Sequence, residues 1–72
     1  METKKQKFVR LAETRTNKIL HYIDLLGNCS NTKNYEYDDK DVNKIFSTIE
    51  RELKTVKEKF KNQSSGPKKF KL

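Results

Sequence analysis

Apolar residues recur at helical spacing in the first third of the chain. They are separated by four or seven positions, which places them on one face of an α-helix. The residues of this first apolar stripe are Phe8, Ala12, Ile19 and Leu26, with Leu11, Tyr22 and Ile23 beside it. We therefore predict a helix over about residues 3–26. Gly27 is expected to end it, because glycine adopts the left-handed conformation at little cost.

A second apolar stripe has a more regular spacing, alternately four and three residues. It consists of Val42, Phe46, Ile49, Leu53, Val56 and Phe60, with Ile45 widening it, and is called the 42–60 stripe below. An uninterrupted heptad pattern of this kind is typical of helices that pack along their length. Asp38 can cap the helix, and acidic residues in the next turn favour its positive end. The prediction is a helix over about residues 39–61.

Two amphipathic helices of similar length predict an all-α fold, an antiparallel two-helix hairpin over residues 1–61. A hairpin alone leaves one side of each apolar stripe in water, and the free energy of burying that area is lost. Three arrangements would recover it. Two hairpins could dimerise into a four-helix bundle, a larger partner protein could complete one hairpin, or the loop of a monomer could fold over the open face. Simple packing of the two helices explains the heptad pattern equally well.

The connection between the helices, residues 27–38, is rich in turn-forming residues within the stretch GNCSNTKNYEY. Asparagine and serine side chains bond nearby backbone groups and hold tight turns, so we expect an ordered loop of twelve residues. Tyr35 and Tyr37 could cover the open end of the hairpin or stack on bases, and covering is the preferred interpretation. The candidates for a structural or partner-binding role here are Asn28, Ser30, Asn31, Asn34, Tyr35 and Tyr37.

The last residues, 62–72, differ in composition from both helices. Ser64, Ser65, Gly66 and Pro67 are expected to interrupt a helix, and three lysines follow them. This composition predicts a disordered basic tail.

Charge indicates an anionic partner. The chain has seventeen basic and ten acidic residues and a net charge of +7, whereas residues 27–41 are mildly acidic. Such a balance favours nucleic acid, although an ordinary soluble protein of a lysine-rich proteome would also show it. A basic stripe on the first helix, which we expect opposite much of the apolar face, comprises Lys7, Arg10, Thr14, Lys18 and His21. The nucleic-acid-binding candidates are Lys7, Arg10 and Lys18, with Lys68, Lys69 and Lys71 of the tail.

Arg15 is unusual because it falls on the first apolar stripe. An unpaired charge in an apolar environment is costly, so the guanidinium must reach solvent or find a partner. Glu50 or Glu52 is the expected counter-charge in a hairpin, and an exposed head at the edge of the packed face is the alternative. A functional interpretation, in which the guanidinium bonds the loop or a bound phosphate, ranks lower, and Arg15 is a further candidate for a structural or partner-binding role.

The sequence has no catalytic signature, so we expect a protein that is not an enzyme and has no metal or cofactor. One cysteine and one histidine allow neither a disulfide within the chain nor a Cys/His zinc cluster. His21 is interpreted as a partly buried or boundary residue. The acidic residues at 38, 39 and 41 are interpreted as helix caps.

The expected location is the cytoplasm. No apolar run reaches membrane-spanning length, and no secretory signal is evident.

The region 8–60 resembles a group of small basic helical proteins of bacterial mobile elements, carried on plasmids, phages and integrated cassettes. The resembling positions are Arg15, Asn17, Lys18, Gly27, Asn28, Ser30, Asn31, Asn34, Tyr35, Tyr37, Lys44, Ile45 and Phe46. Such genes tend to lie beside replication genes, which implies an accessory subunit for a polymerase, primase or helicase. Cys29 stands where an apolar residue such as leucine is expected, which implies that position 29 points inward.

These observations predict a non-catalytic accessory protein of mobile-element DNA replication. It would bind a replication enzyme encoded nearby, contribute basic surface for DNA, single-stranded or primer-template, and could form a homodimer. The alternatives are a small DNA-binding transcriptional regulator and an inhibitor of a host defence complex. Two long helices lack the short geometry of a helix-turn-helix, and inhibitors that mimic DNA are acidic, so both alternatives rank lower.

Overall fold

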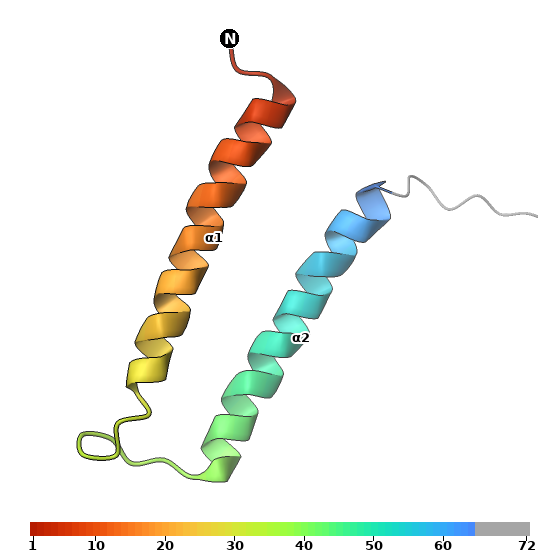
Figure 1. The fold of residues 1–72 in the computed structure, drawn as a ribbon. Coiled ribbons are helices and arrows are strands. Elements are labelled where there is room, and N and C mark those ends of the chain that lie inside the picture. Colours follow the sequence, from red (N-terminus) through yellow and green to blue (C-terminus); the bar gives the residue numbers. More distant parts are fainter. Residues whose placement is uncertain (65–72) are drawn as a thin grey trace, which may run out of the picture. The chain divides into compact units, whose positions relative to one another are not determined.

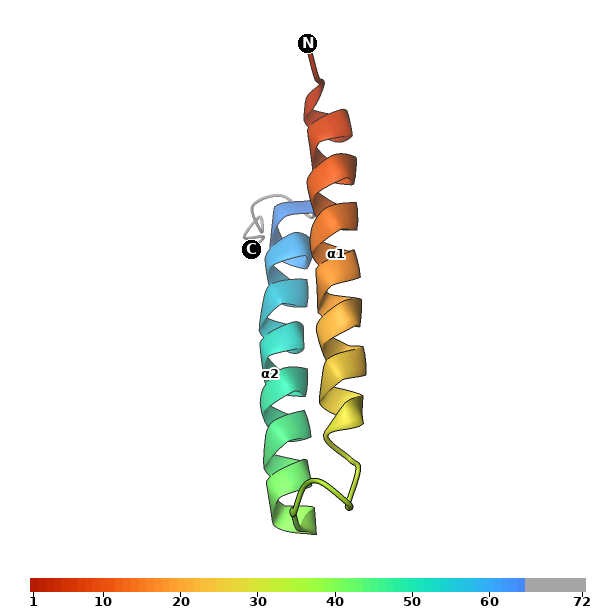
Figure 2. The same ribbon diagram turned by 90° about the vertical axis from the view of Figure 1, so that its left-hand side faces the viewer.

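The computed structural model describes residues 1–64, which form two helices joined by a loop (Figure 1). Helix α1 spans Lys4–Asn28 and helix α2 spans Asp39–Ser64. No strand occurs among the described residues, so the predicted all-helical class is confirmed for this part of the chain. Each helix runs without interruption (Figure 2). The tail lysines at 68, 69 and 71 lie outside the described residues.

Helix α1 begins with a capping box. The Thr3 hydroxyl accepts a hydrogen bond from the Gln6 backbone N–H at 3.0 Å, and the Gln6 side-chain oxygen accepts from the Thr3 N–H at 2.9 Å. Thr3 itself has an extended backbone, with φ −73° and ψ 164°. This reciprocal pair satisfies two of the backbone donors that a helix N-terminus leaves without a partner. It therefore defines the first residue of the helix.

The prediction that Gly27 ends the first helix is wrong. Helix α1 continues through Gly27 to Asn28, and its C-cap, Cys29, has right-handed backbone angles, with φ −68° and ψ −7°. The Cys29 N–H donates to the Leu26 carbonyl at 3.0 Å, and the Ser30 N–H donates to the Gly27 carbonyl at 3.1 Å. Both hydrogen bonds join a carbonyl to the N–H three residues later, as in a 3₁₀ turn. Bonds of this type satisfy the last carbonyls of a helix without a glycine in the left-handed conformation. The loop accordingly covers residues 29–38 and not 27–38.

Helix α2 begins where the sequence predicts. The Asp38 carboxylate accepts from the Asp41 N–H at 2.8 Å, and the Asp41 carboxylate accepts from the Asp38 N–H at 3.1 Å. Asp39 and Asp41 lie in the first turn, so the capping interpretation of this acidic cluster is confirmed. The predicted end at residue 61 is wrong, because the helix continues to Ser64. Residues 62–64, assigned to a disordered tail, are therefore helical.

The chain divides into two compact units, one of residues 1–36 and one that starts at Tyr37. No described residue in either unit is buried. The most shielded apolar side chains are only half-buried, and these are Leu11, Ala12, Leu26, Val42 and Ile49. Both apolar stripes are therefore largely exposed. Neither helix, within the residues described, is long and apolar enough to cross a membrane.

Candidate nucleic-acid interface and partner-binding faces

The basic stripe lies on the side of α1 that faces away from most of the first apolar stripe. A helix turns by about 100° per residue, so Lys7 and Lys18 lie only about 20° apart around the axis, and Leu11 lies about 40° from Lys7. Measured from Ile19 in the apolar stripe, the members of the basic stripe lie about 100–180° around the helix axis. The basic stripe therefore lies opposite much of the apolar face, as expected from the sequence. A ligand bound at Lys7 would also be near the half-buried side chain of Leu11.

Arg10 is the one basic candidate on α1 whose charge is already matched. Its guanidinium makes two hydrogen bonds with the Glu2 carboxylate, from Nε to Oε2 at 2.8 Å and from Nη2 to Oε1 at 3.0 Å. Parallel bonds of this kind are the strongest form of arginine–carboxylate contact. Hydrogen bonding to Arg10 lowers the pKa of Glu2 below 4.5, and the same contact raises the pKa of Arg10. The pair folds residue 2 back over the first turns of α1.

Lys7 and Lys18 differ from Arg10. Both side chains are exposed, and neither forms an ion pair within residues 1–64. Their charges are thus available to an external anion.

The remaining members of the basic stripe, Thr14 and His21, are polar and form no ion pair within residues 1–64. The Thr14 hydroxyl donates to the Arg10 carbonyl at 2.9 Å, and His21 is exposed, with its ring 5.7 Å from that of Tyr22. The expectation of a partly buried histidine is therefore wrong, and the alternative of a boundary position stays a prediction.

Arg15 is exposed on α1 and has no ion pair within its own unit. This placement agrees with the interpretation that its head reaches solvent at the edge of the apolar stripe. The pairing with Glu50 or Glu52 stays a prediction.

The first part of the loop is ordered around Asn31. Its side-chain oxygen accepts from the Lys33 N–H at 3.0 Å, and its carbonyl accepts from the N–H groups of Asn34 and Tyr35 at 3.1 and 3.0 Å. The Asn31 N–H in turn donates to the Asn28 carbonyl at 3.3 Å. The side-chain bond of Asn31 confirms the turn-forming role predicted for that asparagine, while Asn28 and Asn34 take part in these bonds through their backbone groups. Asn28 acts from within α1 and not from the loop.

The loop presents its aromatic side chains to solvent. Tyr35 is 52% exposed and Tyr37 is 41% exposed. Cys29 is also exposed, with its sulfur 3.8 Å from the Leu25 carbonyl, so the inference that position 29 points inward is wrong. Tyr35 belongs to the first unit and Tyr37 to the second. Each ring therefore has surface that another molecule can contact.

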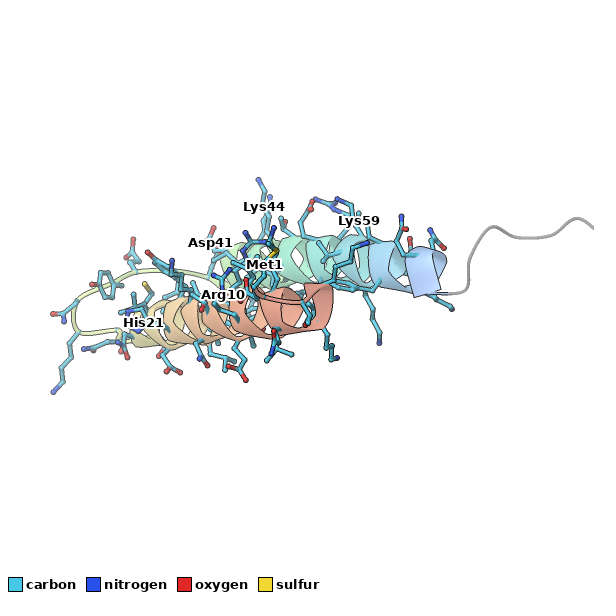
Figure 3. All side chains as sticks on the ribbon, turned by 90° about the horizontal axis from the view of Figure 1, so that it is seen from above. Met1, Arg10, His21, Asp41, Lys44 and Lys59 are labelled. Carbon is cyan, nitrogen blue, oxygen red and sulfur yellow. The ribbon has the colours of Figure 1, made fainter. Side chains whose placement is uncertain are left out.

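Helix α2 carries mixed charge around its apolar stripe. Lys44 and Arg51 lie opposite the stripe, about half a turn from Phe46 and Leu53, and Lys44 extends away from the helix (Figure 3). Glu50, Lys57, Glu52 and Lys59 border the stripe on its two sides, and all four are exposed. Within residues 1–64, no group of three histidine, cysteine or acidic side chains is placed to hold a metal ion.

Two interactions at the N-terminal end of α1 were not predicted from the sequence. They are the Thr3–Gln6 capping box and the Glu2–Arg10 ion pair. The capping box has a recognisable signature, a threonine followed three residues later by glutamine, and a search for caps would have found it. The Glu2–Arg10 pair has no such signature, because its members are eight residues apart and Glu2 precedes the helix.

Comparisons with protein-family models, with curated proteins and with solved structures found no match to this chain.

Proposed function

We propose that this chain is a non-catalytic accessory protein of DNA replication on a mobile element. It binds DNA through the basic stripe of α1 and binds a replication enzyme through an exposed apolar face or the loop. Its helices form an antiparallel hairpin that pairs into a four-helix bundle or is completed by the partner. The class of partner rests on the resemblance to proteins of mobile elements.

The observation that carries the DNA-binding part is the state of Lys7 and Lys18. Both are exposed, lie about 20° apart on one helix, and lack an acidic partner in the described residues. Lysines so placed can neutralise phosphates and release counterions. The net charge of +7 adds long-range attraction for the same ligand.

The observation that supports a protein partner is the exposure of both apolar stripes. Ile19 and Ile23 on α1 are 50% and 49% exposed, and Leu53 and Phe60 on α2 are 54% and 59% exposed. Contiguous exposed apolar surface marks sites of protein association. The loop adds Tyr35 and Tyr37, a residue type enriched at interfaces.

Direct DNA binding is tested by the salt dependence of affinity. We expect fluorescence anisotropy with a labelled single strand and a labelled duplex to show binding that weakens steeply as salt rises. On single-stranded DNA, replacing a lysine that neutralises one phosphate should reduce the slope of log K against log salt by about 0.7. Replacing both Lys7 and Lys18 by glutamine should therefore reduce that slope by about 1.4.

The matched control is Lys40→Gln with Lys44→Gln, which removes the same charge from α2. It should lower affinity only slightly and leave the slope nearly unchanged. Absence of binding at low salt, or equal effects of the two double variants, would contradict the proposed interface.

The partner is tested separately, by co-purification with the polymerase, primase or helicase encoded beside the chain. A stable complex is expected from the proposal. A footprint on the element's own promoter without such a complex would instead indicate a transcriptional regulator.

A further inference from the structure

The guanidinium of Arg10 holds a carboxylate in the geometry in which it would hold a phosphate. Its Nε donates to one oxygen of Glu2 at 2.8 Å, and its Nη2 donates to the other oxygen at 3.0 Å. Arginine binds carboxylates and phosphates alike through two parallel N–H donors on one edge of the guanidinium. This edge of Arg10 is therefore occupied by a residue of the chain itself.

The position of Glu2 is set by the cap of α1. The Thr3 N–H donates to the Gln6 side chain at 2.9 Å, and the Thr3 hydroxyl accepts from the Gln6 N–H at 3.0 Å. The Thr3 carbonyl accepts from the Lys7 N–H at 2.9 Å. Because Thr3 is extended and held by these three bonds, the residue before it is directed back along the helix. The ion pair thus has a structural support that an isolated surface pair lacks.

The contact is nevertheless open to solvent. The side chains of Arg10 and Glu2 are 58% and 37% exposed. Exposed ion pairs contribute little net stability, because water solvates both charges when they separate. A phosphate can therefore approach the guanidinium and replace the carboxylate with little loss of stability.

Lys7 brings a ligand within reach of this contact. It precedes Arg10 by three residues, so the two lie about 4.5 Å apart along the axis and about 60° apart around it. Lys7 is exposed and forms no ion pair within residues 1–64. A strand of DNA held by Lys7 places negative charge close to the Glu2 carboxylate, and repulsion between the two favours opening of the Glu2–Arg10 pair.

We propose that Glu2 is a built-in competitor of phosphate for the Arg10 guanidinium, and that DNA engages Arg10 only by displacing it. In the free protein the carboxylate holds the guanidinium. In the complex a phosphate of the strand takes that place, and Glu2 moves into solvent. The basic stripe therefore binds DNA with lower affinity than it would without Glu2. This inference rests on the proposed function, because it describes how the same DNA site is attenuated.

The size of the effect depends on how often Arg10 is free. For a ligand that needs Arg10, the apparent affinity is reduced to the fraction of molecules in which the guanidinium is unoccupied. Exposed ion pairs of typical strength are formed in roughly half to four-fifths of molecules. Removing the Glu2 carboxylate should therefore strengthen binding about two- to fivefold.

The first experiment is a double-mutant cycle on the whole chain, measured by fluorescence anisotropy with labelled single-stranded DNA at a fixed low salt concentration. Glu2→Gln should bind about two- to fivefold more tightly than the wild-type chain. In an Arg10→Gln background the same substitution should change affinity much less, because the group that Glu2 occupies is gone. Unchanged or weaker binding by Glu2→Gln overturns the proposal. An equal gain in both backgrounds overturns it as well, because Glu2 would then act only through its charge.

The matched control is Glu13→Gln, which makes the same change in net charge one turn beyond Arg10. Glu13 is exposed and forms no ion pair within the described residues. Glu13→Gln should strengthen binding less than Glu2→Gln, and its effect should be the same with and without Arg10. None of these substitutions lies on the first apolar stripe or on the 42–60 stripe, so circular dichroism should show nearly equal helix content in all variants. A gain from Glu13→Gln as large as that from Glu2→Gln contradicts the proposal.

The second experiment does not depend on DNA. Inorganic phosphate is titrated at constant ionic strength into the wild-type chain and into Glu2→Gln, and the Arg10 Nε–H signal is followed by NMR. The signal should shift in Glu2→Gln at a phosphate concentration about two- to fivefold lower than in the wild-type chain. Equal concentrations in the two chains, or no shift in either, overturn the competition at Arg10. The expected shifts without DNA binding by either chain overturn the role of DNA, and with it the proposed function, while the competition at Arg10 stands.

Discussion

At the scale of single residues, the contact with most consequence is that between Glu2 and Arg10. Arg10 looks like a DNA-binding residue by position, yet two hydrogen bonds hold it against a carboxylate. An anion that binds Arg10 must compete with Glu2. Lys7 and Lys18 face no such competition within residues 1–64. The three basic candidates on α1 are therefore not equivalent.

The pair makes a prediction about pH. Arg10 lowers the pKa of Glu2, so the folded value lies below the unfolded one. The contribution of the pair to stability is complete above the unfolded pKa and is lost as pH falls through the folded pKa. A carboxyl titration followed by NMR should give Glu2 a pKa below 4.5, and Arg10→Gln should return it towards that value. An unchanged Glu2 pKa in Arg10→Gln would show that the pair is not formed in solution.

At the scale of elements, the two helices are stabilised differently at their ends. Helix α2 has acidic residues in its first turn and Lys61 in its last, both favourable to the helix dipole. Helix α1 has no acidic residue in its first turn and no basic residue in its last turn, while Lys4, Lys5 and Lys7 stand near its positive end. The Thr3–Gln6 capping box and the preceding Glu2 offset that arrangement. The N-terminus of α1 consequently depends on its cap.

Two substitutions in α1 should change stability in opposite directions. Gly27→Ala should raise the free energy of unfolding by about 0.5–1 kcal/mol, because Gly27 is helical and a β-carbon there meets nothing within 4 Å. Thr3→Ala should lower it by about 0.5–2 kcal/mol through loss of the cap. Denaturation followed by circular dichroism measures both. Destabilisation by Gly27→Ala would indicate that the helix ends at Gly27 after all.

At the scale of the whole molecule, the absence of buried side chains among the described residues governs stability. Isolated helices are marginal in water, and most helical stability in proteins comes from packing of an amphipathic face. Helices α1 and α2, of 25 and 26 residues, each present such a face largely exposed. Covering these faces is therefore coupled to folding, and apparent stability should rise with the concentration of whatever covers them.

A prediction about the two loop tyrosines concerns the whole molecule, because Tyr35 lies in the first unit and Tyr37 in the second. Tyr35→Ala with Tyr37→Ala should leave the helix content nearly unchanged, since both rings are about half exposed. Binding to the replication enzyme should weaken by roughly tenfold or more, the typical cost of truncating interface tyrosines. Calorimetric titration measures the change, and Tyr35→Phe with Tyr37→Phe separates the ring from the hydroxyl. If stability and partner binding both survive the alanine substitutions, the loop is only a connector.

Local patterns determined much of the structure. The spacing of Phe46, Ile49 and Leu53 was sufficient to predict α2, because a period near 3.6 places apolar residues on one face only in a helix. Asp38 was identifiable as a cap because a capping bond joins residues three apart in the chain. The turn-forming role of Asn31 is local in the same sense. Each of these features depends on residues within one or two helical turns.

Other features required the three-dimensional structure. Helix α1 passes through Gly27 because the backbone bonds around Leu26 and Ser30 continue the turn, which residue type alone does not reveal. Arg10 meets Glu2 because the extended Thr3 directs the preceding chain back along the helix. The exposure of Cys29 and Tyr35 depends on the path that the chain takes after α1. The sequence by itself thus determined where the helices lie, because propensity and periodicity act locally, and the tertiary structure decided which charges and rings remain available, because that depends on the path of the chain in space.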